Sequence, residues 1–381
     1  MSPAPPAQPG PTPLGLRIAD LVRTEGPISV ERYMALALGD PEHGYYTTRD
    51  PLGRAGSFVT APEISQMFGE LIGLWCLAVW STMGEPSPIR LVELGPGRGT
   101  LMRDALRAAR LRPAFLEAAD LHLVETSPVL RDRQREALGE ILPGAPSWHA
   151  APETLPEGPA LVVANEFFDA LPIRQFPNTP RGWCERHVGL DTEGRLAFGL
   201  SPDPDPGVAS LPAFLAAPEG ALIEVAPAAV ALTAALARRL AVQGGALLAI
   251  DYGSTRPGHG DSLQAVKSHR FVDPLAEPGE ADLTTHVDFS ALARAALASR
   301  AAVHGPVTQG SFLIDLGLKQ RAATLRRDAG PEARAGVDAD EARLIGQGEG
   351  EMGGLFKVMA IGDALLPPLP GFAGRITRPG A

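Results

Sequence analysis

Apolar residues occur along the chain at two spacings, and the alternation between them predicts an α/β fold. Short unbroken runs rich in leucine and β-branched residues are typical of strands buried on both faces of a parallel sheet. Runs of this kind predict strands at 89–94, 121–125, 147–149, 160–164, 245–253, 302–307 and 355–361. Segments with helical spacing lie between most of them, so we expect a mostly parallel sheet covered by helices.

Helical spacing and capping residues predict where the helices begin. Two helices are expected within 14–38, the second one capped by Ser29. Thr60 with Glu63 three residues later fits a capping box, and Pro62 stands just inside the start. One helix is therefore expected to run from there through the apolar residues that follow. The other predicted helices are 100–109, 228–241, 289–298 and 312–327.

The pattern changes twice outside the strand–helix alternation. Short alternating runs separated by proline- and glycine-rich turns fill 173–226 and predict an antiparallel insertion on the parallel core. The segment 261–287 is expected to be long and irregular, and 329–340 polar and mobile. The expected parts of the chain are a disordered tail (1–13), a helical N-terminal part (14–85), the first half of the core (86–170), the insertion (171–226), the second half of the core (227–361) and a proline-rich tail (362–381).

A glycine-rich turn follows the first predicted core strand. The strand 89–94 carries Glu93 and leads into Gly95, Gly97 and Gly99, after which helical spacing begins. Backbone N–H groups and the helix dipole at such a turn face an anion. The spacing G-x-G-x-G departs from the G-x-G-x-x-G of dinucleotide-binding folds, which counts against a dehydrogenase.

The next strand also ends in an acid. Glu125 closes the run 121–125, and a carboxylate at a strand tip can accept hydrogen bonds from both hydroxyls of an unphosphorylated ribose. The alternative is a tight strand–helix turn in which the glycines serve packing only, but Glu93 before the turn and Glu125 after it favour ligand binding. Ser127 caps the helix that follows. The polar side of that helix is expected to carry Arg131, Arg133, Gln134 and Arg135.

A second group of polar side chains lies at the end of a later strand. Asn165, Glu166 and Asp169 follow the strand 160–164, at the edge where open α/β sheets bind ligands. Three polar groups between two apolar runs are costly unless something pairs with them. The alternative is that Asn165 and Asp169 cap the turn. The position of the group after the glycine turn favours a catalytic or substrate-orienting role.

Three further sets of residues have both a structural and a functional interpretation. Glu63 and Gln66 either line the ligand pocket or serve only the helix start, with Gln66 in solvent, and the residues alone favour the helix start. Trp148 either stacks on an adenine or packs in the core, and packing is favoured. His286 and Asp288 have the spacing of a metal-ligand pair, but no third ligand is spaced to join them, so no metal site is predicted.

Composition and charge restrict the class of protein. The 381 residues, 45% of them hydrophobic and 20% charged, suit a globular protein with one large domain or two domains. The net charge of −10 argues against a nucleic-acid partner and suits a basic peptide or an arginine-bearing protein surface. Cys76 and Cys184 cannot build a disulfide framework or a zinc site. The uncharged, proline-rich start resembles neither a signal nor a transit peptide, and no apolar run is long enough to span a bilayer, so a cytoplasmic protein is expected.

Taken together, these motifs resemble the MidA family of S-adenosylmethionine-dependent methyltransferases. The family is related to the mitochondrial assembly factor that methylates an arginine of the 49-kDa subunit of respiratory complex I. The resemblance extends from about residue 14 to residue 361, and the motifs that carry it are 56–75, 92–100, 124–130, 165–176, 249–253 and 282–289. It implies a Rossmann-like class I fold with a seven-stranded, mostly parallel sheet, and protein-arginine N-methylation with S-adenosyl-L-methionine as donor and S-adenosylhomocysteine as product.

The resemblance also implies a role for each motif residue. Glu166 is implied as the carboxylate that pairs with the substrate arginine, with Asp169 as second candidate and Glu63 as third. The residues implied to hold the methyl donor are Glu93, Gly95, Gly97, Gly99, Glu125, Thr126 and Asn165.

The expected setting is that of a bacterial, cytoplasmic member of the family without a mitochondrial leader, whose eukaryotic relatives work in the mitochondrial matrix. Its expected partner is an arginine-bearing protein such as a complex I subunit, with no nucleic acid and no membrane insertion. Apolar surface on the insertion leaves a homodimer open. The alternatives are a non-catalytic assembly chaperone that keeps the donor pocket and an NAD-dependent oxidoreductase.

Overall fold

The computed structural model describes residues 11–48, 60–139, 141, 144–209, 217–372 and 374–380. The chain forms two compact units, each assembled from three segments. The first unit comprises Met1–Phe58, Ala170–Ala228 and Pro257–His286, and the second comprises Val59–Asp169, Ala229–Arg256 and Val287–Ala381. The predicted helical part 14–85 is thus divided between the two units. Most of the predicted tail 1–13 lies outside the described residues, but its last residue, Pro13, already belongs to a helix.

A nine-stranded sheet forms the centre of the second unit. Its strands are β2 (Ile89–Leu94), β3 (Ala119–Val124), β4 (Ser147–His149), β5 (Ala160–Asn165), β10 (Gly245–Ser254), β14 (Val287–Asp288), β15 (Ala302–Thr308), β16 (Phe356–Gly362) and β17 (Ile376–Thr377). Its main path is β17-β15-β16-β10-β5-β2-β3-β4, and β14 pairs with β10. The strands from β4 to β10 pair in parallel, whereas β16 is antiparallel to both β10 and β15. This confirms the predicted mostly parallel sheet, to which β14 and β17 are additions.

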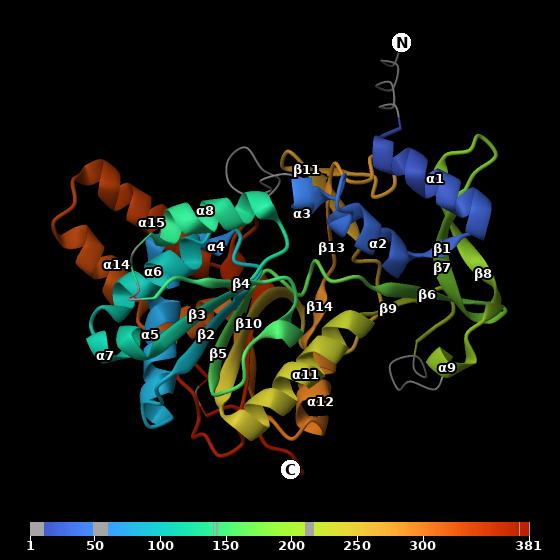
Figure 1. Ribbon diagram of the computed structural model, residues 1–381. Helices are drawn as coiled ribbons and strands as arrows, with labels where there is room; N and C mark the ends of the chain where they lie inside the picture. The colour runs from blue at the N-terminus through green and yellow to red at the C-terminus, as the bar shows by residue number, and fades with distance from the viewer. Residues whose placement is uncertain are drawn as a thin grey trace. The chain divides into compact units, whose positions relative to one another are not determined.

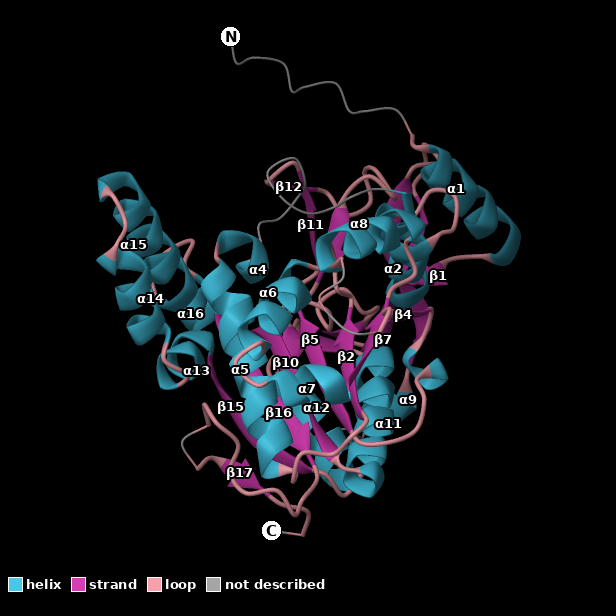
Figure 2. Cartoon of the chain, turned by 60° about the vertical axis from the view of Figure 1, so that its left-hand side comes forward, coloured by secondary structure: helices cyan, strands magenta, loops and turns pink. Residues whose placement is uncertain are grey.

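Helices cover both faces of this sheet. They are α4 (Ala61–Ile64), α5 (Gln66–Thr82), α6 (Thr100–Ala109), α7 (Pro113–Ala118), α8 (Pro128–Leu138), the 3-10 helix η1 (Pro152–Thr154), α11 (Pro227–Gln243), α12 (Phe289–Ala298), α13 (Gln309–Asp315), α14 (Leu318–Arg327), α15 (Pro331–Ile345) and α16 (Met352–Leu355). Helices α5, α6 and α7 lie on one side of the strands, and α11 and α12 on the other (Figure 1). Helices α13 to α16 gather at the β15 end of the sheet (Figure 2). In the part of the chain that the structure describes, no helix is long and apolar enough to cross a membrane.

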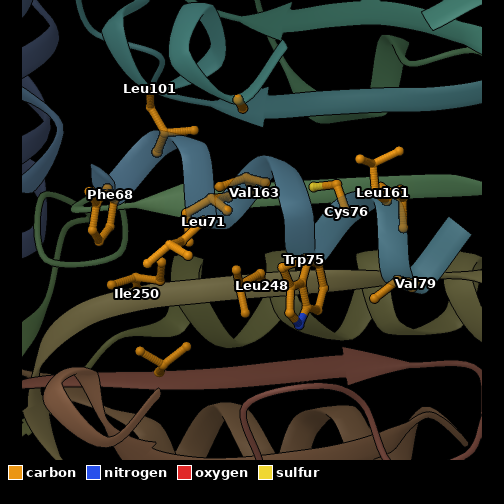
Figure 3. Close-up of a cluster of buried hydrophobic side chains, with 14 of the residues drawn as sticks. Phe68, Leu71, Trp75, Cys76, Val79, Leu101, Leu161, Val163, Leu248 and Ile250 are labelled. Carbon is orange, nitrogen blue, oxygen red and sulfur yellow. The ribbon is translucent and has the colours of Figure 1, made fainter. Parts of the chain in front are cut away.

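Helix α5 carries the largest side chains of the core. Phe68, Leu71 and Trp75 are buried on it and point at the sheet, where β5 and β10 supply the facing apolar side chains (Figure 3). The facing residues labelled there are Leu161, Val163, Leu248 and Ile250. Apolar area removed from water in this way is the main term that stabilises such a unit.

Two glycines allow α5 to pack directly against α6. A Cβ added at Gly73 would lie 2.3 Å from the carbonyl oxygen of Ala105, and one added at Gly69 would lie 2.8 Å from the Cβ of Asp104. These separations are below van der Waals contact, so no other residue type fits without a shift of one helix. The backbone of α6, which begins directly after the glycine turn, is therefore fixed against the core.

A buried carboxylate links three helices on this side of the sheet. Glu70 of α5 accepts hydrogen bonds from Arg107 Nη2 of α6 at 3.0 Å and from Arg321 Nε and Nη2 of α14 at 2.7 and 3.0 Å. A two-point guanidinium–carboxylate pair of this kind fixes direction as well as distance. It holds the C-terminal helices to the core.

The prediction that Thr60 and Glu63 form a capping box at the start of one long helix is wrong. Thr60 precedes α4 but its side chain makes no capping hydrogen bond, and the predicted single helix is broken at Ser65. Ser65 has an extended backbone, and its hydroxyl caps α5 by accepting from the N–H of Met67 at 3.4 Å. Glu63 is engaged elsewhere, because it accepts a hydrogen bond from Thr100.

Four other predictions of secondary structure are corrected by the structure. The helix predicted at 312–327 is two helices, because Gly317 has φ of 96° between α13 and α14. The segment 329–340, predicted to be mobile, lies mostly in α15. The segment 261–287, predicted to be irregular, contains three strands. The tail predicted at 362–381 contains β17, which pairs with β15.

The first unit is built from antiparallel sheets and the N-terminal helices. Its five-stranded sheet contains β1 (Ile28–Ser29), β6 (Arg174–Thr179), β7 (Gly182–Leu190), β8 (Leu196–Pro204) and β9 (Leu222–Val225). Its three-stranded sheet contains β11 (Gln264–Lys267), β12 (Arg270–Val272) and β13 (Asp282–Thr284). Its helices are α1 (Pro13–Glu25), α2 (Val30–Gly39), α3 (Tyr45–Thr48) and α9 (Pro206–Ala209). The predicted antiparallel insertion and the predicted cap at Ser29, whose hydroxyl accepts from the N–H of Arg32, are both confirmed.

The contact between α5 and α6 predicts a large difference between two glycine substitutions. Gly73→Ala should lower the free energy of unfolding by about 1–3 kcal/mol, the usual cost of overpacking a core. Gly336→Ala in α15 is the matched control, because its added Cβ meets nothing within 4 Å. It should raise the free energy of unfolding by up to about 1 kcal/mol through helix propensity. Urea denaturation measures both, and equal effects would contradict the proposed role of the close contact.

Candidate active site

The candidate site lies at the carboxyl edge of the parallel strands of the second unit. Strands β2, β3, β5 and β10 run in the same direction, so their C-terminal ends meet at one edge. In register, Leu94 lies beside Val124 and Ala164, and Asn165 lies beside Ile250. The residues implied by sequence therefore come from the C-terminal ends of these strands, from the loops that follow them or from α4.

The turn after β2 depends on its three glycines. Gly95, Gly97 and Gly99 have φ of 61°, 52° and 81°, in the left-handed region that other residues rarely adopt. A Cβ at Gly95 would also lie 3.0 Å from Phe167. The turn after β2 and the loop after β5 therefore touch, which brings the two predicted groups of polar side chains together. The N–H groups at the start of α6 come directly after this glycine turn in the chain.

Glu93 is a buried acid just before this turn. It shares a strand face with Ile89 and Leu91, which pack in the core, and only 3% of its surface is exposed. Burial raises the pKa of Glu93 to about 8. Within the described part of the chain its Oε2 has no hydrogen-bond partner. A buried acceptor of this kind is expected to receive a donor from a bound molecule.

Glu125 follows β3 and is held at both carboxylate oxygens. Oε1 accepts from the N–H of Ser127 at 2.7 Å, and Oε2 accepts from Gln134 Nε2 at 3.3 Å. Burial raises the pKa of Glu125, and these two donors oppose the shift. The predicted cap is confirmed, because the Ser127 hydroxyl accepts from the N–H of Leu130. The neighbouring Thr126 is exposed.

Gln134 is not on the polar side of α8, contrary to the prediction. It is fully buried and lies on the same helix face as the buried residues Leu130 and Leu138. Its Nε2 donates to the carbonyl oxygen of Gly97 at 2.7 Å as well as to Glu125. The spacing of four between these three residues was the available signal, since it places a polar side chain on an apolar stripe.

The loop after β5 holds Glu166 in an unusual backbone conformation. Glu166 has φ of 50°, which costs a non-glycine residue about 1–3 kcal/mol. Its N–H donates to the carbonyl oxygen of Ile250 at 2.9 Å, so the strand pairing continues into the turn. Its Oε1 accepts from the N–H of Ala61 and from Asn165 Nδ2, both at 3.3 Å. Strain of this kind is typical of functional sites, where the surrounding structure imposes it.

Asp251 positions the rest of this loop, and sequence reasoning gave it no role. Its Oδ2 accepts from the N–H of Phe168 at 3.0 Å and of Asp169 at 3.2 Å, and its Oδ1 accepts from the N–H of Tyr252. Burial raises the pKa of Asp251 well above its usual range, and the nearby charges of Asp169 and Glu166 add to the shift. Three acids therefore lie close together at the ends of β5 and β10.

Helix α4 brings Glu63 to the glycine turn. Its Oε1 accepts from Thr100 Oγ1 at 2.5 Å, and its Oε2 lies 3.9 Å from Arg98 Nη1. Gln66 is exposed, as the structural interpretation predicts, and its Oε1 accepts from Arg107 at 3.3 Å. The structure thus separates the two residues: Glu63 lies beside the turn and Gln66 lies in solvent.

The remaining candidates are Trp148, Asp288 and His286. Trp148 donates from Nε1 to Gln134 Oε1 at 2.8 Å, and the Arg135 guanidinium lies 4.6 Å from its ring centroid. Asp288 caps α12 by accepting from the N–H groups of Ser290 and Ala291. His286 is exposed. Across the described ranges there is no cluster of three or more side chains suited to hold a metal ion.

Comparisons with known proteins identify the kind of enzyme. Residues 71–307 match the family model described as "Putative S-adenosyl-L-methionine-dependent methyltransferase". The mitochondrial protein arginine methyltransferase NDUFAF7 of Danio rerio is 40% identical over 340 residues, covering 84% of this chain and 80% of the relative. The protein of the same name from Homo sapiens is 38% identical over 344 residues, covering 84% and 77%. The names place those relatives in mitochondria, while the cytoplasmic location of this chain stays a prediction.

A solved structure supports the same relationship across nearly the whole chain. It is that of a superfamily member from Burkholderia thailandensis bound to S-adenosyl-homocysteine, with 31% identity and a TM-score of 0.84, covering 97% of this chain and 99% of the other. The comparisons thus support a methyltransferase rather than the oxidoreductase alternative. This chain belongs to the MidA family of S-adenosylmethionine-dependent methyltransferases.

Proposed function

We propose that this chain is a protein-arginine N-methyltransferase whose reacting atoms meet at the carboxyl edge of the sheet, beside Glu166. The relatives named as protein arginine methyltransferases support the reaction. The main observation in favour of this location is the strained backbone of Glu166. Glu166 places a carboxylate on the loop that touches the glycine turn. A carboxylate there suits a guanidinium substrate better than a neutral one.

The residues at the edge fit the methyl donor. The donor has an α-ammonium group and two ribose hydroxyls, and the described residues leave the buried acceptors Glu93 Oε2 and Asn165 Oδ1 without a partner. We propose that Glu93, Asn165 and the three glycines hold the amino-acid end and that Glu125 accepts the ribose hydroxyls, with Thr126 next to it. S-adenosylmethionine supplies an electrophilic methyl group on a positively charged sulfur.

Glu166 would activate the arginine. A guanidinium has a pKa of about 13.8 and is a poor nucleophile when it is fully protonated and delocalised. A paired carboxylate localises the positive charge on the nitrogens that it contacts and leaves another nitrogen richer in electrons. Glu166 Oε1 is held by the donors on Ala61 and Asn165, so the carboxylate is already oriented before a substrate arrives.

Acids at this edge of the sheet would also accept the proton that the guanidinium loses. A carboxylate within hydrogen-bond reach can accept this proton as the nitrogen–carbon bond forms. Glu166 is the first candidate, Asp169 the second and Glu63 the third. Asp251 acts through the loop, because it holds the N–H groups of Phe168 and Asp169.

The substrate is proposed to be an arginine-bearing protein surface, with a complex I subunit as the first candidate. The net charge of −10 favours a basic partner. The deciding experiment incubates the full chain with isotope-labelled methyl donor and a cell lysate, followed by mass spectrometry of the labelled peptide. Label on an arginine nitrogen supports the proposal. Label on another residue type would overturn it, and an absence of label with intact donor binding would favour the chaperone alternative.

The assignment of Glu166 predicts a loss of turnover without a loss of donor binding. Glu166→Gln keeps the side-chain length but removes the charge that pairs with a guanidinium, so kcat should fall by about 10²–10⁴-fold. Titration calorimetry should find S-adenosylhomocysteine affinity unchanged within about twofold. Glu219→Gln, at an exposed position of the first unit, is the control and should keep full kcat. Full turnover by Glu166→Gln would rule out the assignment.

The buried Glu93 predicts a pH dependence of stability in the ligand-free protein. Its pKa is about 8 in the folded chain and near the ordinary value of 4.5 in the unfolded chain. Between these values the unfolded chain is ionised while the folded chain keeps the proton, so the free energy of unfolding falls as pH rises and levels off above pH 8. Glu93→Gln mimics the protonated form and should remove this contribution.

Thermal denaturation at two pH values measures the effect. The wild type and Glu93→Gln should unfold at similar temperatures at pH 5, whereas at pH 9 the variant should unfold at the higher temperature. Glu219→Gln should follow the wild type at both pH values. A constant offset between Glu93→Gln and the wild type would show that Glu93 is not protonated in the folded chain at neutral pH.

A further inference from the structure

The third glycine of the turn packs against a residue of α8 that has no part in the function proposed above. A Cβ added at Gly99 would lie 3.3 Å from Gln134 Cα and 3.5 Å from Gln134 Cγ. Gly99 therefore makes room for the side chain of Gln134 in addition to adopting a left-handed conformation. The glycine turn and α8 come this close together because Gly99 has no side chain.

The partners of Gln134 fix the orientation of its amide. An indole Nε1 only donates, and Trp148 Nε1 donates to Gln134 Oε1 at 2.8 Å. The amide nitrogen must then face Gly97 O at 2.7 Å and Glu125 Oε2 at 3.3 Å. An amide nitrogen carries two hydrogens, so it serves both acceptors at once. The side chain is fully buried, so no water competes for these bonds.

This arrangement leaves the Glu125 carboxylate with acceptor capacity for a ligand. A carboxylate has about four lone-pair sites. The N–H of Ser127 and the amide of Gln134 bond to different oxygens of Glu125, and the N–H of Thr126 also interacts with this carboxylate. These three donors do not exhaust the acceptor capacity of the carboxylate. Two neighbouring hydroxyls on one sugar ring can both reach a single carboxylate.

We propose that Gln134 is a positioning residue for the nucleoside of the methyl donor. By bonding to Gly97 and Glu125 together, it fixes the separation between the turn that would hold the amino-acid end and the carboxylate that would hold the ribose. Gln134 acts through Glu125 and touches no ligand itself. The inference rests on the proposed function, because it assumes that Glu125 accepts the ribose hydroxyls.

Binding of two ligands to Gln134→Met tests the proposal. Methionine has a similar length but cannot donate, so the affinity for S-adenosylhomocysteine should fall by about 10–100-fold, as for a lost hydrogen bond to a charged group. The affinity for the 2′,3′-dideoxy analogue, which lacks both hydroxyls, should fall by less than about threefold. In turnover assays KM for the donor should rise while kcat at saturation stays within about threefold of wild type.

A matched control separates this effect from a general loss of packing. Gln309→Met makes the same change at another fully buried glutamine of the second unit, whose Nε2 donates to the carbonyl oxygen of Leu344 at 2.9 Å. It should leave both affinities unchanged. If Gln134→Met does not fold, Gln134→Leu replaces it, because leucine matches the apolar residues Leu130 and Leu138 on the same helix face and has no hydrogen to give Gly97 or Glu125.

The outcomes distinguish this inference from the function on which it rests. Glu125→Ala should weaken S-adenosylhomocysteine binding by at least as much as Gln134→Met. If Glu125→Ala binds as well as wild type, the placement of the ribose is wrong and the inference is overturned with it. Two other outcomes would overturn only the positioning role of Gln134, provided that Glu125→Ala weakens binding. In one, Gln134→Met lowers the affinities for both ligands by the same factor. In the other, it changes neither affinity.

Discussion

The parallel pairing of β5 between β2 and β10 is the constraint on which the second unit depends. All of β5 is buried, so its strand interior accepts only apolar side chains and polar groups are confined to its ends. Because the three strands run in one direction, the acids that follow them gather at a single edge. Helix α5 covers one face of these strands, and its close contact with α6 fixes the helix that starts at the glycine turn.

The buried acids at this edge differ in whether the protein supplies hydrogen-bond donors to their carboxylate oxygens. Asp251 and Glu125 receive hydrogen bonds from the protein itself, which offset part of the cost of removing a charge from water. Glu93 has an oxygen without such a donor among the described residues. A site that binds a cationic ligand is thus less stable when empty than a fully compensated core would be, as is common where function competes with stability.

Much of the fold follows from local pattern, and the errors have identifiable causes. The strand runs and the cap at Ser127 depend on near neighbours in sequence, and the structure confirms them. The capping box at Thr60 fails because Thr100, on another element, engages Glu63. Helix α15 was not predicted because its sequence lacks an apolar stripe. Its only buried residue is Leu344, too little to mark one face.

The arrangement of the candidate site residues could not be predicted from the sequence. The glycines and terminal acids form short motifs, whereas Gln134 and Asp251 matter through contacts with residues far along the chain. Gln134 interrupts an apolar stripe, which is a detectable signal. Asp251 lies near the C-terminal end of a buried strand, as other acids here do, and only the pairing with β5 shows which backbone groups it meets.

The place of β16 in the sheet has a consequence for synthesis on the ribosome. This strand lies between β10 and β15, although both of them precede it in the chain. Until it emerges, a nascent chain exposes unpaired edges of β10 and β15 with apolar side chains, and such edges attract other strands. The order of translation therefore delays completion of the sheet, and protection by a chaperone during that interval would matter more for this protein than for one whose interior strands all precede its edge strands.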